Sequence, residues 1–242
     1  METTHLFGLV GRNIAYSFSK KYFSHKFKKL LLKTHAYEVF DLPSIEQLPL
    51  LLAKENLKGF NVTIPYKEQI LPYLNELSEE AQTIGAVNTV SVKNGHLKGY
   101  NTDAEGFEKT LLLHKKKHHQ SALILGDGGA AKAVKYILNK HNIPYLTVSR
   151  RGEPTFDSLS TQDVAQNLLI IQCTPVGTFP HVEDCLVFPF EGLGENHLVI
   201  DLIYNPEYTA FLKKAAEKGA KTVNGYYMLE QQAEKAWEIW NY

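Results

Sequence analysis

The chain has 242 residues, enough for one large or two small domains with a buried core. Its 26 Lys and Arg residues equal its 26 Asp and Glu residues, so no net charge favours a nucleic acid or an anionic membrane as partner. The sequence has no apolar run of about 20 residues and no signal-peptide pattern, and Cys173 and Cys185 form no metal-ligand spacing, so we expect a soluble cytoplasmic protein without a metal site.

The N-terminal segments predict a first strand followed by an amphipathic helix. Residues 5–11 are mostly apolar and end in glycine, as a buried strand does. Beyond Ser19, apolar residues recur at helical spacing with lysines opposite them, at Tyr22, Phe23, Phe27, Leu30 and Leu31. Taken alone, Ser19 is expected to be the N-cap of this helix.

Strands and short helices are predicted to alternate up to residue 113. We expect strands at residues 36–40, 57–64 and 97–102, and helices at 44–55, 78–84 and 106–113, with another helix starting at 66. Lys93–His96 has the composition of a hairpin turn. Polar residues gather where these segments end, at Thr63, Lys67, Asn88, Asn101 and Asp103. Each could be a cap or turn residue, but together they suit a pocket for a polar substrate.

The stretch from Ser121 to Ala133 reads as a strand, a tight glycine turn and a helix. Its glycines fit G-x-G-x-x-A, with Gly126 for the turn, Gly128 for close approach of a pyrophosphate, and Ala131 for helix–strand packing. The helix N-terminus would offer N–H groups to the phosphates. Glycine turns also join strands to helices for structural reasons, so the motif alone is only moderately specific.

The continuation completes a βαβ unit and indicates the cofactor. A helix near residues 130–141 leads into a strand at 145–148. An NAD site would place an acid after this strand, but the chain has Ser149, Arg150 and Arg151 there, and guanidinium groups suit a 2′-phosphate. The alternative is a pair of solvated surface arginines. We favour NADP as the cofactor.

The remaining segments predict the second half of a parallel sheet. Continuous apolar runs at 168–171 and 198–201 are typical of buried parallel strands. A helix at 210–218 ends at Gly219, and a short strand follows at 221–223. The last helix carries one apolar face, formed by Leu229, Ala233, Trp237 and Trp240.

Five ordered blocks of the sequence resemble the shikimate dehydrogenase family over nearly the whole chain. The first is Gly59-Phe60-Asn61-Val62-Thr63-Ile64-Pro65-Tyr66-Lys67. The others are the residues at 85–89, 99–103, 201–206 and 224–233.

The resemblance implies an α/β fold of two domains: an N-terminal mixed α/β substrate domain (1–104 plus 226–242) and a Rossmann-type NADP-binding domain (105–225). The last helix would return to the N-terminal domain. The implied activity is reversible hydride transfer between NADPH and 3-dehydroshikimate, giving shikimate in aromatic amino-acid biosynthesis.

The resemblance also assigns roles to particular residues. Lys67 and Asp103 would form the catalytic pair. Substrate binding would fall to Ser17, Ser19, Thr63, Lys67, Asn88, Asp103, Tyr204 and Gln232, which makes Ser19 a carboxylate ligand in place of an N-cap. Cofactor binding would fall to Gly126, Asp127, Gly128, Gly129, Ala130, Ser149, Arg150, Arg151, Leu202 and Gly225.

The chain departs from the family pattern at several positions. Asn13, Tyr16 and Lys20 stand where proline, histidine and proline are usual, and Gln172 replaces an asparagine. Asp127 places an acid in the glycine loop, which is unfavourable near a pyrophosphate unless its side chain points away. Residues 152–166 form a short stretch, so we expect trimmed loops and a thinner wall on the adenine side.

Two other functions remain open. One is a quinate-accepting or NAD-preferring relative with the same architecture. The other is a non-catalytic ligand-binding protein of this fold, although binding alone would not require both Lys67 and Asp103. A monomer and a homodimer are both consistent with the sequence.

Overall fold

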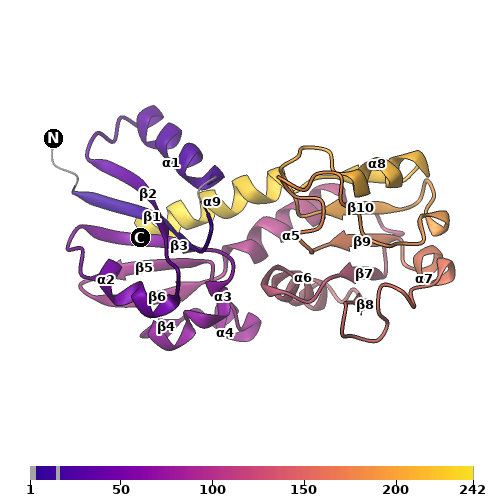
Figure 1. The fold of residues 1–242 in the computed structure, drawn as a ribbon, viewed down its shortest axis with the longest axis horizontal. Coiled ribbons are helices and arrows are strands. Elements are labelled where there is room, and N and C mark those ends of the chain that lie inside the picture. Colours follow the sequence, from indigo (N-terminus) through magenta and orange to yellow (C-terminus); the bar gives the residue numbers. More distant parts are fainter. Residues whose placement is uncertain (1–3, 15–16, 242) are drawn as a thin grey trace. The chain divides into compact units, whose positions relative to one another are not determined.

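The computed structural model describes residues 4–14 and 17–241, and the chain divides into two compact units. Unit 1 comprises Met1–Thr102 and Ala233–Tyr242, and unit 2 comprises Asp103–Gln232. The chain therefore enters unit 2 once and returns to unit 1 within its last helix (Figure 1). No helix within the described ranges is long and apolar enough to cross a membrane.

Unit 1 is built on a mixed sheet, in which the described residues form six strands in the order β2-β1-β3-β5-β6-β4. The first three strands are parallel, whereas β5 runs antiparallel to both β3 and β6. Asn94 and Gly95 join β5 to β6 with φ of 52° and 77°, as the predicted hairpin turn requires. The strands are β1 (His5–Gly11), β2 (His35–Asp41), β3 (Leu57–Val62), β4 (Glu76–Leu77), β5 (Thr89–Lys93) and β6 (His96–Tyr100).

Helices cover both faces of this sheet because its strands alternate their side chains between two apolar clusters. On β1, Phe7 and Leu9 join the cluster that packs against α1 and the end of α9, whereas Leu6 and Val10 join the cluster of α2, α3 and α4. The helices are α1 (Phe18–Lys29), α2 (Leu48–Leu52), α3 (Tyr66–Gln69), α4 (Glu79–Ile84) and α9 (Tyr226–Asn241), with 3-10 turns at Ile45–Gln47 and Leu71–Tyr73.

The prediction that Leu30 and Leu31 belong to the apolar face of α1 was wrong. The helix stops at Lys29, and Leu31 adopts a positive φ of 58°. As a result Leu30 and Leu31 are 48% and 79% exposed, and Leu32 packs against the core in their place. The left-handed residue turns the chain toward β2, which a helical periodicity cannot foresee.

The end of α9 belongs to unit 1, as predicted for the last helix. The Trp240 indole packs over Gly59, where an added Cβ would lie 2.3 Å from Nε1. That Nε1 also donates a hydrogen bond of 3.0 Å to the Val90 carbonyl. Glycine at position 59 is therefore what allows the tryptophan to lie directly on β3.

Unit 2 contains a parallel sheet, in which the described residues form five strands in the order β11-β10-β9-β7-β8. The strands are β7 (Ala122–Leu125), β8 (Tyr145–Val148), β9 (Leu169–Gln172), β10 (Leu198–Asp201) and β11 (Lys221–Val223). The doubly wound dinucleotide fold has the order 3-2-1-4-5-6, so these strands take places 1, 2, 4, 5 and 6. Among the described residues no strand takes the third place, beside β8.

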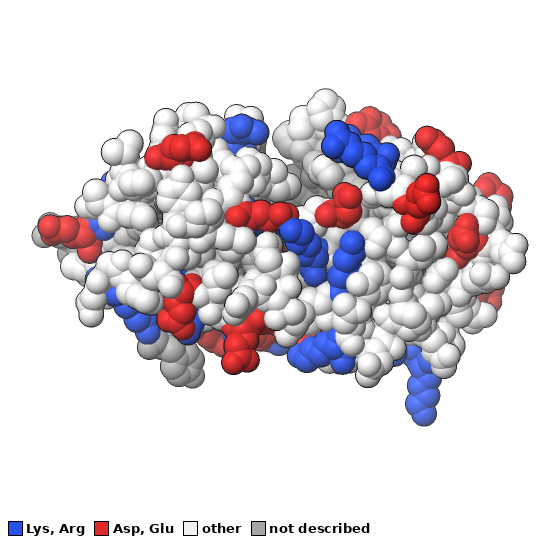
Figure 2. Space-filling model, turned by 90° about the horizontal axis from the view of Figure 1, so that it is seen from below, with Lys and Arg blue, Asp and Glu red and all other residues white. Residues whose placement is uncertain are grey.

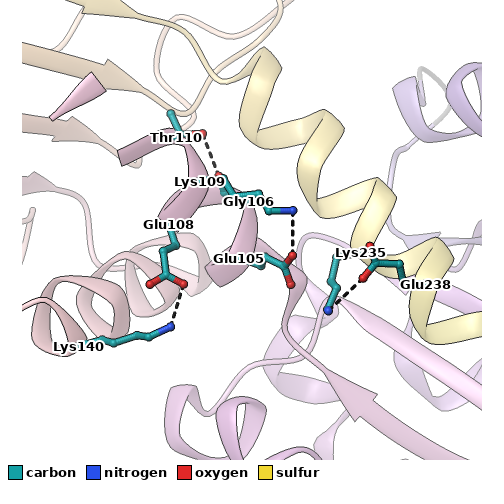
Figure 3. Close-up of polar contacts among 8 residues, drawn as sticks. All are labelled: Glu105, Gly106, Glu108, Lys109, Thr110, Lys140, Lys235 and Glu238. Carbon is teal, nitrogen blue, oxygen red and sulfur yellow. Dashed lines mark hydrogen bonds and ion pairs between the residues drawn. The ribbon is translucent and has the colours of Figure 1, made fainter. Parts of the chain in front are cut away.

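Helices α5 (Thr102–His114), α6 (Gly129–Lys140), α7 (Thr161–Gln166) and α8 (Ala210–Glu217) complete unit 2, with a 3-10 turn at Phe190–Gly192. Glu108 connects α5 to the end of α6, because it forms an ion pair with Lys140 at 2.8 Å (Figure 3). It also hydrogen-bonds to His141 at 2.6 Å. Acidic and basic side chains are interspersed on the face drawn in Figure 2, in keeping with the balanced composition.

The environment of the His35 imidazole should make the stability of unit 1 fall at acidic pH. The imidazole stacks on His5 at 4.4 Å, and its enclosed Nδ1 has no hydrogen-bond partner among the described residues. Burial, and then the neighbouring His5, lower the pKa of His35 below its usual 6.5. The unfolded chain therefore takes up this proton first, so the stability from neutral His35 is complete above about pH 6.5 and is lost as the pH falls below it.

We expect His35→Phe to reduce the loss of melting temperature between about pH 7.5 and pH 5.5, measured by thermal denaturation. The matched control is His25→Phe on the exposed side of α1, which should keep the parent's pH dependence. Equal pH slopes for the parent and His35→Phe would contradict this origin of the acid sensitivity.

Candidate functional site

The carboxyl edge of the unit 2 sheet begins with the glycine turn after β7. Gly126 has φ of 109°, and a Cβ there would come within 2.9 Å of the Thr174 side chain. Its N–H donates to the Val148 carbonyl, and Cys173 N–H donates to the Leu125 carbonyl, both at 2.8 Å. The turn is therefore held between β8 and β9, and only glycine fits its first position.

The N-terminus of α6 fits a bound pyrophosphate. Gly128 is its N-cap residue, no side chain caps the helix, and an added Cβ at Gly128 would meet nothing within 4 Å. The first-turn N–H groups, those of Gly129 and Ala130 among them, have no carbonyl partner within the helix. A twelve-residue helix adds the positive end of its dipole there. Asp127 is exposed, so its carboxylate is solvated.

The turn after β8 carries the two predicted arginines. Ser149 is buried and its N–H lies 3.4 Å from the Pro154 carbonyl, which closes the turn. Arg150 and Arg151 lie within this turn and are both exposed. No acid occupies the end of the strand, so this edge has the charge that a 2′-phosphate requires.

Leu202 and Gly225 are brought into direct contact at the ends of β10 and β11. A Cβ on Gly225 would lie 2.1 Å from the Leu202 carbonyl oxygen, and Gly225 N–H donates to the Ile203 carbonyl at 2.9 Å. These two predicted cofactor residues therefore form one backbone-to-backbone contact. Tyr204 follows in the same turn and is half-buried.

Asp201, which the sequence analysis did not single out, holds this turn in place. One carboxylate oxygen accepts the Ile203 N–H at 3.0 Å and the other accepts the Thr209 hydroxyl at 2.7 Å. Burial raises the pKa of Asp201 to about 6, although these two hydrogen bonds act in the opposite direction. An acid at the end of an otherwise apolar strand was the sequence signal for this role.

The glutamine that replaces asparagine at position 172 also has a structural role. It is fully buried, and its side-chain oxygen accepts the Thr174 N–H while its nitrogen donates to the Val176 carbonyl at 3.3 Å. Its backbone carbonyl accepts the Leu202 N–H. Gln172 thus joins the loop after β9 to the turn after β10.

In unit 1 the predicted substrate residues lie where β1, β3 and β6 end. Thr63 follows β3, and a Cβ on Gly11 at the end of β1 would lie 2.6 Å from its methyl group. Lys67 is half-buried in α3, and its carbonyl accepts the Val87 N–H at 2.8 Å. The turn that carries Thr63 and Lys67 is therefore fastened to both the β1 end and the segment before β5.

Asn88 is buried and makes hydrogen bonds through both atoms of its amide. Its oxygen accepts the Thr102 N–H at 2.7 Å, and its nitrogen donates to the Thr102 hydroxyl at 3.0 Å. This contact starts α5 at Thr102, so the predicted start at Gly106 was wrong. The acceptor lies 14 residues away along the chain, which explains why local signals missed it.

Ser17 and Ser19 have different roles in the structure. Ser17 is the N-cap of α1 and accepts the Lys20 N–H at 3.2 Å, so the expectation that Ser19 caps this helix was wrong. Ser19 is buried and hydrogen-bonds to Tyr37. The Tyr16 departure lies outside the described residues. Asn13 adopts φ of 59°, which proline could not.

Tyr37 connects Ser19 to Asn88 through a buried polar network that sequence reasoning missed. The Tyr37 hydroxyl donates to the Asn61 side-chain oxygen at 2.8 Å, and the Asn61 nitrogen donates to the Thr89 hydroxyl at 3.0 Å. Thr89 Oγ1 lies 3.2 Å from Asn88 Oδ1. Polar residues within otherwise apolar strands were the available signal.

Asp103 and Gln232 lie in unit 2 on two adjacent helices. Asp103 is buried in the first turn of α5, where a helix favours an acid. Gly106 follows three residues later, and a Cβ there would lie 2.6 Å from the Met228 carbonyl oxygen and 3.2 Å from the Gln232 backbone nitrogen, both on α9. Lys67 belongs to unit 1, so the pairing of Lys67 with Asp103 remains a prediction.

The chain is similar to proteins of known activity. The family model described as "Shikimate dehydrogenase substrate binding domain" matches residues 9–90. Shikimate dehydrogenase (NADP(+)) of Desulforamulus reducens is 36% identical over 98% of this chain and 90% of that protein.

Solved structures agree over the same length. That of Thermus thermophilus shikimate 5-dehydrogenase, in complex with NADP(H) and shikimate, has a TM-score of 0.87 and 32% identity over 98% of this chain and 93% of that one. Quinate dehydrogenase of Corynebacterium glutamicum, in complex with NAD, has a TM-score of 0.84 and 26% identity over 99% and 94%.

We expect Gly225→Ala to destabilise the protein by about 1–3 kcal/mol, because its Cβ would overlap the Leu202 carbonyl and the backbone would have to move. Thermal denaturation measures this loss. Gly194→Ala is the matched control, since a Cβ at Gly194 meets nothing within 4 Å. Equal melting temperatures for the two variants would contradict the contact.

Proposed function

Because the chain belongs to the shikimate dehydrogenase family, we propose that it catalyses NADP-dependent, reversible reduction of 3-dehydroshikimate to shikimate in aromatic amino-acid biosynthesis. The observation that carries this activity is the α6 N-terminus, which no side chain caps, behind a glycine turn at the edge of a parallel sheet. The next strand, β8, is followed by a turn that carries two arginines. When bound, NADPH supplies the hydride. The residues of the chain bind and orient the ring carbonyl and move one proton.

In this proposal one domain binds the substrate and the other binds NADP. The substrate-binding domain comprises residues 1–104 and 226–242, and the NADP-binding domain comprises residues 105–225. The family match to residues 9–90 supports the first assignment, and the glycine turn supports the second. Gly126, Asp127, Gly128, Gly129 and Ala130 line the pyrophosphate side. Ser149, Arg150 and Arg151 face the 2′-phosphate, and Leu202 and Gly225 lie toward the nicotinamide end.

The substrate residues act by charge and hydrogen bonding. Lys67 would lie at the reacting oxygen, where its ammonium donates the proton or stabilises the developing charge. Asp103 would bind a ring hydroxyl and orient Lys67. Ser17, Ser19 and Tyr204 would hold the carboxylate, and Thr63, Asn88 and Gln232 would hold the hydroxyls.

The cellular setting is part of the same proposal. Both cysteines are free thiols, which supports a reducing cytoplasm as the location. No nucleic acid or membrane is expected as a partner, and the enzyme would act as a monomer or homodimer. Assays with shikimate and quinate, each against NADP and NAD, test the function and separate it from that of a quinate dehydrogenase.

Lys67→Ala should lower kcat by about a hundredfold or more while KM for shikimate changes only several-fold, because one proton-transfer group contributes on the order of 10²–10⁴. Lys93→Ala, at the exposed β5–β6 hairpin, is the matched control and should behave like the parent. A raised KM with normal kcat would make Lys67 a binding residue. Asp103→Ala should impair both parameters.

Replacing Ser17 and Ser19 together with alanine should raise KM for shikimate at least about tenfold, since hydrogen bonds to a charged group contribute about 1.5–3 kcal/mol each. The Ser17 change should also lower the melting temperature, because it removes the N-cap of α1. Normal shikimate binding with a lower melting temperature would show that both serines are only structural.

The parent should prefer NADP over NAD by roughly a hundredfold in kcat/KM, and less at higher ionic strength. Replacing Arg150 and Arg151 with alanine should remove this preference and leave activity with NAD nearly unchanged. If the double variant kept its preference for NADP, the arginines would be surface charges only.

A further inference from the structure

The sheet of unit 2 ends at β8, which has β7 as its one neighbour among the described strands. In the doubly wound order a third strand would lie on the other side of β8. Here residues 149–160, all of them described, contain no helix or strand and lead directly into α7. The crossover that would build this outer strand is therefore replaced by a twelve-residue connection.

This connection turns back to the core and does not extend the sheet. Ser149 N–H approaches the Pro154 carbonyl, and Thr155 N–H donates to the Ser158 hydroxyl at 2.9 Å. Leu159 is then buried in the cluster that contains the apolar residues of α7 and α8, and Phe156 packs against the same cluster. The apolar side chains of the connection are thus used inside unit 2.

The third strand of the doubly wound order would lie beside β8, on the side of the fold where the adenosine half of a dinucleotide binds. In this fold the pyrophosphate lies at the helix after the first strand, and the 2′ position of the ribose lies at the end of the second. These places correspond to α6 and to the end of β8. The adenosine half of a bound dinucleotide would therefore lie over β8, toward the edge where the described residues form no third strand.

The turn after β8, at this edge of the sheet, carries charged and exposed side chains. Arg150, Arg151 and Glu153 are all exposed, and the next apolar residues are engaged in the core. Two guanidinium groups can hold a phosphate through charge-assisted hydrogen bonds. An exposed turn offers a purine ring little apolar enclosure, which is what a selective base pocket needs.

We propose that this protein selects its cofactor by the 2′-phosphate and hardly by the adenine base. The proposal rests on the proposed role of Arg150 and Arg151. It predicts that NADP analogues with an altered base bind nearly as tightly as NADP, whereas loss of the 2′-phosphate is costly.

Isothermal titration calorimetry on the full chain tests this without turnover. The ligands are NADP, NAD, nicotinamide hypoxanthine dinucleotide phosphate, and 1,N6-etheno-NADP, which has an enlarged base. We expect both base-modified ligands to bind within about fivefold of NADP, and NAD to bind about a hundredfold more weakly. A larger loss for either base-modified ligand would overturn the proposal, because the base would then be recognised.

The Arg150→Ala, Arg151→Ala double variant distinguishes binding of the 2′-phosphate by the arginines from recognition of the adenine base. It should bind NADP about as weakly as NAD, while the ratio between NADP and the hypoxanthine analogue stays within the same fivefold range. Equal affinity of the parent for NADP and NAD would overturn both the role of the arginines and this proposal. Turnover of shikimate, assayed separately, reports on the proposed activity itself.

Discussion

The hydrogen bond from the Thr102 N–H to the Asn88 side chain is the contact on which the unit 1 site depends most. At 2.7 Å it fixes the first residue of α5, and so decides that Asp103 lies in the first helical turn. Because both atoms of the amide are engaged with Thr102, Asn88 cannot turn without breaking two hydrogen bonds. A buried amide that loses its partners costs about 1–3 kcal/mol per group, which holds this arrangement rigid.

The edge of the unit 2 sheet is fixed by a different means, the close approach of backbones. Gly126 and Gly225 lie where a Cβ would strike Thr174 or Leu202, and buried Asp201 and Gln172 satisfy the N–H groups of the adjoining turns. The predicted cofactor residues are thus carried by strand ends and tight turns, with no mobile side chain needed to shape the edge. Such a preformed edge presents N–H groups to a phosphate at little cost in entropy.

Local signals in the sequence predicted most strands and the glycine turn, whereas the return of the last helix was implied by the family resemblance. Local signals failed where distant residues decide the outcome. The start of α5 depends on Asn88, and the exposure of Leu31 depends on a left-handed turn toward β2. The Tyr37 network was missed because a polar residue in an alternating strand looks solvent-facing until the covering helix is known. The short stretch after Gly152 predicted a thin wall on the adenine side, but only the strand order shows that the described residues form no third strand beside β8.

The position of β8 at the sheet edge also has a consequence for local dynamics. A parallel strand with one neighbour leaves the backbone groups on its other side without ladder partners, and such a strand opens at lower free energy than one inside the sheet. The turn with Arg150 and Arg151 follows this strand directly. Amide protons of β8 should therefore exchange with solvent sooner than those of β7 or β9. A ligand held by that turn would slow their exchange, since binding to the closed strand alone shifts the opening equilibrium.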